Sequence, residues 1–188
     1  MRYRNVCAIG LSALAGVIIA ASTAARAELP PLPQSVADSQ RRFAMNFPSD
    51  WEVVTQAQSM VALLGAGPLN AGSRPTINVV TESLAGPMSP QAYAAAAQRL
   101  ASVTLHNYAV IQESNAAVQG RPAYYRYMTW EMNTGVTLYQ LQVFFTEGLT
   151  GFVITGSTIN EPERVLRDMP LITRIIETFR VAQAPPTN

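Results

Sequence analysis

Residues 123–158 read AYYRYMTWEMNTGVTLYQLQVFFTEGLTGFVITGST and decide the fold, because two short turn signals separate three long apolar runs. The first turn, Asn133-Thr134-Gly135, contains the Asn and Gly residues that favour a tight hairpin. The second turn lies at Glu147-Gly148. The pattern predicts a three-stranded antiparallel meander. Its strands span 123–132, 136–146 and 151–158.

The first turn also determines which residues lie opposite each other. If Met132 pairs with Val136, the whole register follows, and Arg126 lies opposite Gln142. Both faces then carry bulky side chains, which a sheet with one face in water would not carry. One face has the pairs Tyr124–Phe144, Met128–Gln140 and Trp130–Leu138; the other has Tyr125–Val143, Tyr127–Leu141 and Thr129–Tyr139. We therefore predict a single α+β domain in which an antiparallel sheet is sandwiched between helices.

Two segments have the signals of helices that cover this sheet. Ser89-Pro90 begins the first, because Ser caps free backbone amides and Pro suits the first helical position. It is expected to end at 105–107. Its sheet-facing side consists of Tyr93, Ala97, Leu100 and Thr104. The second begins at 160–162, and Pro170 predicts a kink or a break into two helices. Its apolar stripe consists of Val165, Met169, Ile172, Ile176 and Phe179.

Alternating apolar and polar residues, bounded by turn residues, predict further strands outside the meander. They span 43–47, 51–55, 60–64, 76–83 and 108–114, with a Gly- and Pro-rich loop at 65–75. The folded domain is expected to cover 41–181. Residues 28–40 are expected to form a Pro-rich extended leader with at most a short helix, and 182–188 a flexible tail.

The first 27 residues have the pattern of a secretory signal peptide. Arg2 and Arg4 precede an apolar run from 6 to 21, and Ala25-Arg26-Ala27 provides the small residues at which signal peptidase cleaves. Cys7 lies at the start of the apolar run and would leave with the signal. We expect an exported protein that begins near Glu28, in the periplasm or outside the cell, or in the thylakoid lumen if the source is photosynthetic.

The remainder excludes several classes of partner. From residue 28 onward there are ten Arg, no Lys and twelve acidic residues. This balance argues against nucleic acid, which requires a concentrated basic surface. No later stretch has the roughly 20 consecutive apolar residues that a membrane span requires. We expect a monomer without disulfides or a membrane span.

The remainder also offers little for catalysis or metal binding. It has no Cys and one His, His106, which we expect to interact with free carbonyl groups at the end of the first helix. The glycines at 65, 67 and 72 lack the Lys-Ser/Thr of a phosphate loop. The acids Glu82, Glu113, Glu131 and Glu147 lack the spacing of a calcium loop, and solvated strand acids explain them better. We predict no catalytic residues, metal or cofactor, and therefore no enzyme.

One group of residues on the meander is a candidate for recognition: Arg126, Trp130, Gln140 and Gln142. An Arg binds a carboxylate through two hydrogen bonds, and aromatic neighbours exclude water. A second interpretation is a polar seam between sheet and helix, in which Arg126 lays its stem over Tyr124 and Phe144. Both interpretations stay open from the sequence.

The chain also resembles the PsbP/DcrB-like superfamily of small exported α/β proteins. The resemblance covers roughly 41–181. It rests on FPSDW, NVVTESL, SPQAYAAAAQRL, QGRPAYYRYM, QLQVFFTEGLTGFVITGST and LITRIIETFRV. It implies an antiparallel sheet between helices and no enzymatic activity. We expect that the protein binds or assists a protein partner at the membrane surface, or has a lumenal extrinsic or assembly role at photosystem II. The group around Arg126 leaves a third function open, the binding of a small ligand in the periplasm.

Overall fold

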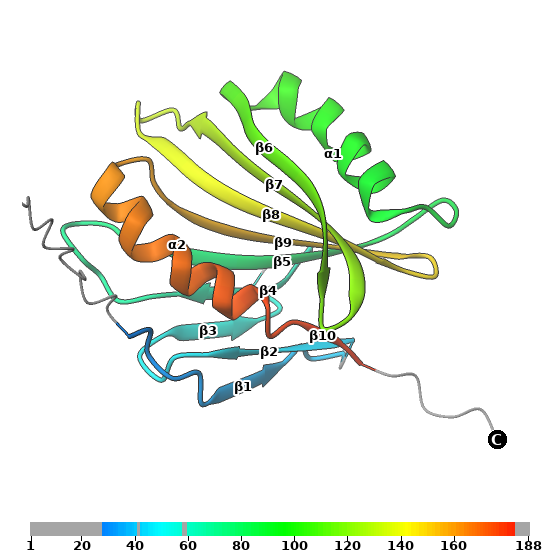
Figure 1. Ribbon diagram of the computed structural model, residues 1–188, viewed down its shortest axis with the longest axis horizontal. Coiled ribbons are helices and arrows are strands. Elements are labelled where there is room, and N and C mark those ends of the chain that lie inside the picture. The colour runs from blue at the N-terminus through cyan, green and yellow to red at the C-terminus, as the bar shows by residue number, and fades with distance from the viewer. Residues whose placement is uncertain (1–27, 41, 58–59, 183–188) are drawn as a thin grey trace, which may run out of the picture.

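The computed structural model describes residues 28–40, 42–57 and 60–182 and contains two antiparallel sheets and two helices (Figure 1). The larger sheet has seven strands in the order β3-β4-β5-β9-β8-β7-β6. They are β3 Glu52–Thr55, β4 Val61–Ala66, β5 Thr76–Ser83, β9 Thr150–Ile159, β8 Thr137–Glu147, β7 Arg121–Glu131 and β6 His106–Val118. The smaller sheet consists of β1 Gln34–Ala37, β2 Phe43–Phe47 and β10 Arg180–Val181. The helices are α1 Pro90–Thr104 and α2 Pro162–Ile176.

The predicted meander is confirmed as β7-β8-β9, with the predicted register. Trp130 pairs with Leu138, Arg126 with Gln142 and Tyr124 with Phe144. The first turn closes when the Gly135 amide donates to the Met132 carbonyl at 2.8 Å, and Gly135 has a positive φ of 80°. A glycine adopts this conformation without steric cost, so the turn sequence determines the pairing.

The two helices cover opposite faces of the seven-stranded sheet, so the α+β sandwich is confirmed. On one face α1 buries Tyr93 and Ala94 against Tyr124 and Phe144. On the other face α2 and the smaller sheet enclose the main core (Figure 1). Three phenylalanine rings are in contact in that core. The centroid of the Phe179 ring lies 4.9 Å from that of Phe145 and 5.6 Å from that of Phe152.

The predicted boundary between leader and domain at residue 41 is wrong. Residues 34–37 form strand β1, which pairs with β2, and not a stub of helix. Arg174 of α2 donates to the Leu29 and Pro30 carbonyls, both at 3.1 Å. At the other end, the Ala182 amide donates to the Arg42 carbonyl at 2.7 Å. The expected signal peptide at 1–27 and most of the expected tail, 183–188, lie outside the described residues.

Several smaller expectations also differ from the structure. Of the two alternatives expected at Pro170, the break into two helices is wrong, because α2 is one element from Pro162 to Ile176. Leu100 is 66% exposed and Thr104 is also exposed, so neither faces the sheet. His106 begins β6, and its Nδ1 lies 3.7 Å from a carboxylate oxygen of Glu131, so it interacts with a neighbouring strand rather than with helix carbonyls. Val61–Ala66 is longer than the predicted strand at 60–64 and takes up the start of the predicted loop.

Candidate functional site

A groove of about 500 Å³ opens on the face of the sheet that α1 covers only in part. Residues from β5, β8 and β9, from the loop before β5 and from the β7–β8 turn line it, and none of them belongs to α1. The lining includes Arg74, Thr76, Asn78, Met132, Val136, Leu138, Gln140, Ser157 and Ile159. Typical pockets for small molecules have volumes of roughly 300–1,000 Å³, so the groove has the size of a ligand site.

Two cross-strand rows of uncharged polar residues form what we call the polar floor. Strand pairing places Thr76, Ser157 and Gln140 in one row. It places Asn78, Thr155 and Gln142 in the next row on the same face. Side chains of successive residues alternate between the faces of a strand, which brings these six side chains to one side.

The polar floor is recessed but has unused hydrogen-bonding groups. Gln140, Thr155 and Ser157 are each at most 8% exposed. The Gln140 amide donates to the Ser157 hydroxyl at 2.8 Å. The side chains of Thr76, Asn78 and Gln142 are half-buried, and no polar atom of the floor is among the buried atoms that lack a hydrogen-bond partner in the described residues. The polar groups of the floor that have no protein partner therefore contact solvent, and a ligand with matching donors and acceptors can replace that water.

An apolar wall borders the polar floor at the end of the sheet. Leu138 and Ile159 pair across β8 and β9, and Trp130 lies opposite Leu138 on β7. Met132 and Val136 add to this wall from the two sides of the hairpin turn. The groove therefore combines neutral hydrogen-bonding groups below with an apolar surface beside them.

The charged groups near the groove are paired. Arg74 at its rim lies 3.0 Å from a Glu52 carboxylate oxygen. Asp168 accepts from the Thr158 hydroxyl at 2.6 Å, but Thr158 points to the α2 face. The groove thus presents neutral chemistry to a ligand.

Arg126 lies beneath α1 and not in the groove, although it is in the same row as Gln142. It is 1% exposed and donates from Nε to Glu113 at 2.8 Å. Its Nη2 donates to the Ala94 carbonyl of α1 at 2.9 Å. Its guanidinium carbon lies 5.3 Å from the centroid of the Phe144 ring. This placement gives Arg126 a packing role between the sheet and α1.

Tyr108 lies close to this buried cation. Burial raises the pKa of the Tyr108 phenol above its ordinary value, and the charge of Arg126 partly opposes that shift. The Tyr108 hydroxyl and Arg126 Nη1 are buried and lack hydrogen-bond partners within the described residues. Trp130 Nε1 is a third such group. The four residues predicted as a candidate recognition group are therefore not together in one site. Gln140 and Gln142 belong to the polar floor, Trp130 lies beside the apolar wall, and α1 covers Arg126.

The four acids weighed as calcium ligands are dispersed. Glu113 pairs with Arg126 and Glu147 pairs with Arg121. Glu131 accepts from Asn107 at 2.7 Å, and Glu82 is exposed on β5. Among the residues that the structure describes, no group of three or more His, Cys, Asp and Glu could hold a metal ion. In the same part of the chain, no helix is long and apolar enough to cross a membrane.

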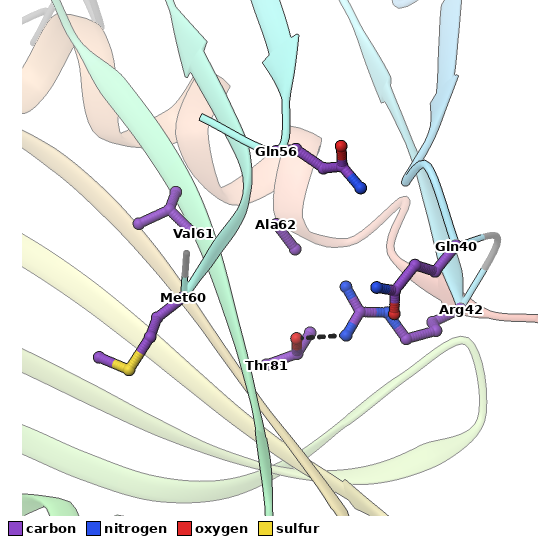
Figure 2. Close-up of a pocket in the computed structure, with 7 residues that line it drawn as sticks. All are labelled: Gln40, Arg42, Gln56, Met60, Val61, Ala62 and Thr81. Atoms are coloured by element: carbon purple, nitrogen blue, oxygen red, sulfur yellow. Dashed lines mark hydrogen bonds between the residues drawn. The ribbon is translucent and has the colours of Figure 1, made fainter. Parts of the chain in front are cut away.

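A second hollow, of about 470 Å³, lies between the two sheets near β4 and β2 (Figure 2). Figure 2 shows Arg42 pointing toward Thr81, with Nη1 donating to the hydroxyl at 2.6 Å. The same guanidinium pairs with Asp38 at 2.6 Å. Because its cation is already paired with protein groups, this hollow is a weaker candidate than the groove.

The sequence reasoning missed four floor residues: Thr76, Asn78, Thr155 and Ser157. A signal was present, because polar residues alternate with apolar ones in TINV at 76–79 and in ITGS at 154–157. In a strand covered on both faces, such alternation marks one face as polar. The alternation identifies which face of the strand is polar, but it does not show whether a helix covers that face.

Comparisons with known proteins support the fold. No family model matches the chain, and a sequence comparison with curated proteins finds no match. The solved structures that resemble it include cyanobacterial PsbP (CyanoP) from Synechocystis sp. PCC 6803, with 14% identity, a TM-score of 0.58, and coverage of 79% of this chain and 92% of that one.

Two further structures are similar to the same degree. LpqN, involved in cell envelope biogenesis of Mycobacterium tuberculosis, has 17% identity and a TM-score of 0.57, with 80% of this chain and 90% of that chain covered. The Ran-binding protein Mog1p of Saccharomyces cerevisiae has 10% identity and a TM-score of 0.56, with 79% and 94% covered. At these identities the likeness concerns the fold and not the function. The predicted resemblance is confirmed at that level: the chain has the PsbP-like fold.

Proposed function

We propose that this protein is an exported, non-catalytic domain that binds a small uncharged ligand in the groove. The observation that carries the proposal is the polar floor, where Thr76, Asn78, Gln140 and Ser157 line the groove with uncharged hydrogen-bonding groups beside an apolar wall. The floor is built on interior strands of the sheet, which hold side chains in fixed positions before a ligand arrives. Preorganised polar groups of this kind bind without a large ordering cost.

The chemistry of the groove supports binding without catalysis. His106 is 67% exposed and lies on β6, outside the groove lining. General acid–base catalysis needs a titratable group within hydrogen-bond reach of the reacting atoms. The only titratable side chain in the described lining, Arg74, is paired with Glu52.

A second candidate function is the binding of a protein partner, at the membrane surface or at photosystem II. The observation that favours it is the fold itself, which the chain shares with CyanoP and with the Ran-binding protein Mog1p. A protein could engage the groove only by inserting a projecting segment, because the polar floor is recessed.

A photocrosslinking amino acid at Thr134, which is exposed and lines the groove, tests both candidates. We expect illumination in the native envelope to yield an adduct with the mass of a small molecule, because Thr134 lines the groove that would hold the ligand. The matched control carries the crosslinker at Glu163, an exposed residue of α2 on the opposite face. An adduct of protein size at Thr134 would favour the second candidate, and equal adducts at both sites would contradict the groove.

Export is proposed from the segment 1–27, which lies outside the described residues. We expect the protein recovered from its native source to begin at Glu28-Leu29-Pro30, because Ala25-Arg26-Ala27 is the cleavage pattern. N-terminal sequencing of the purified protein measures this. An Ala27→Phe variant should accumulate as the longer precursor, and an intact Met1 N-terminus in the wild-type protein would contradict export.

A further inference from the structure

We infer that the ligand of the groove is a neutral saccharide, an assignment that rests on the proposed binding function and makes its ligand class specific. In the groove lining, Asn78 and Gln140 each carry an amide with both acceptor and donor groups, and Thr76 and Ser157 add hydroxyl groups. Sugar hydroxyls both donate and accept, so they match this set of groups. A ligand with only acceptors or only donors would leave half of the floor unsatisfied.

The spacing of the floor fits an extended chain of hydroxyl groups. Asn78 and Gln140 lie on β5 and β8, with β9 between them. Neighbouring strands are about 4.8 Å apart, so the two strands that carry the amides are separated by roughly 10 Å. A disaccharide spans that distance, and a single ring reaches one amide and the Ser157 hydroxyl on β9.

The absence of a free charge in the described lining argues against ionic ligands. Arg74 is paired with Glu52, and Arg126 is covered by α1 and paired with Glu113. A carboxylate or ammonium group on a ligand would lose its hydration in the recess and find no counter-ion there, which is strongly unfavourable. The groove therefore selects uncharged molecules.

The apolar wall distinguishes a saccharide from a peptide. A sugar ring presents C–H groups on its faces and hydroxyls at its edge, so it can pack against Leu138 and Ile159 while its hydroxyls reach the floor. An extended peptide is recognised chiefly through backbone hydrogen bonds to a free strand edge. The strands below the groove, β5, β9 and β8, are each paired on both sides and offer no such edge.

A binding experiment on the purified protein tests this assignment. The probes are an array of neutral oligosaccharides, followed by calorimetric titration with the best of them. We expect saturable binding, weakened about tenfold by Asn78→Ala or by Gln140→Ala, since each removes hydrogen bonds to the ligand. The matched control is Gln112→Ala, which removes an exposed amide on the edge strand β6 and should leave affinity unchanged.

Parallel titrations with neutral tripeptides and with an uncharged alkyl detergent separate the outcomes. Binding of a peptide or detergent that depends on Asn78 and Gln140, without saccharide binding, overturns the saccharide assignment and leaves the binding function intact. Saccharide binding that is insensitive to both substitutions places the ligand elsewhere and overturns the assignment. If no probe binds and the crosslinker at Thr134 yields no adduct, both proposals fail. Melting curves of each variant verify that loss of binding is not loss of folding.

Discussion

Substitution of Gly156 by valine is expected to lower the free energy of unfolding by about 3 kcal/mol, at the upper end of the usual cost of overpacking. Gly156 lies on β9 directly beneath α2. A Cβ atom built there would lie 2.1 Å from Cγ2 of Ile172, far inside van der Waals contact. Ile172 is fully buried, so it cannot rotate into solvent to make room. The helix itself would have to move away from the sheet and open the main core.

Urea denaturation of Gly156→Val measures this loss, with Gly86→Val as the matched control. A Cβ at Gly86 meets no atom within 4 Å, so that variant should be close to wild type. Adding Ile172→Ala to Gly156→Val should recover part of the loss, because it removes the clashing methyl group; a double-mutant cycle measures the coupling. An unchanged urea midpoint for Gly156→Val would show that α2 does not pack this closely on β9.

The meander could be predicted residue by residue because its information is local. A tight turn at 133–135 leaves one register for the hairpin, and the register then assigns every side chain to a face. The N-cap of α1 was equally local: the Ser89 hydroxyl accepts from the Ala92 amide at 3.2 Å. In both cases the residues that determine the structure are within a few positions of one another.

The smaller sheet could not be predicted because its partners are far apart in sequence. β2 pairs with β1 on one side and with β10, near the C-terminus, on the other. The alternation in 43–47 indicates a strand with one buried face, but the same pattern suits a strand of either sheet. Only the packing of the whole chain selects the partner strand. In addition, the Pro-rich composition of 28–40 gave no pattern that predicts β1.

The break that was one of the two alternatives expected at Pro170 does not occur, for a physical reason. A proline inside a helix removes the hydrogen bond to the carbonyl four residues earlier, here that of Leu166. Pro170 and Leu166 are both exposed, and Leu166 is 77% exposed, so water can bond to that carbonyl. The buried side of α2, with Ile172, Ile175 and Ile176, keeps the helix continuous against the sheet.

The candidate site was predicted in part. The register placed Gln140 and Gln142 on one face with Arg126 and Trp130, which the structure confirms. The sequence could not show where α1 lies across that face. Its position decides that Arg126 is covered and that Asn78 and Thr76 are open, and this position depends on contacts between α1 and strands far along the chain.

Replacement of Arg126 by alanine is expected to cost about 3–5 kcal/mol, the range for breaking a buried ion pair by removing one partner. Three groups lose their donor at once: the Glu113 carboxylate, the Ala94 carbonyl and the Gln98 side chain. The variant also leaves a cavity against Phe144, where the guanidinium packed. Because two of these partners belong to α1, the substitution is expected mainly to weaken the packing of that helix on the sheet.

Urea denaturation and hydrogen exchange of α1 together distinguish this account from a general loss of stability. Arg99→Ala is the matched control, since Arg99 is an exposed residue of the same helix, and it should change little. Arg126→Met keeps the packed stem and removes the charge, so it should remain folded while amides at 94–104 exchange faster than in the wild type. If those amides keep wild-type protection in Arg126→Met, the guanidinium does not hold α1 in place. In that case only the packing of Tyr93 and Ala94 against Tyr124 and Phe144 holds α1 on the sheet. The Arg126 guanidinium would then pair with Glu113 without stabilising the position of the helix.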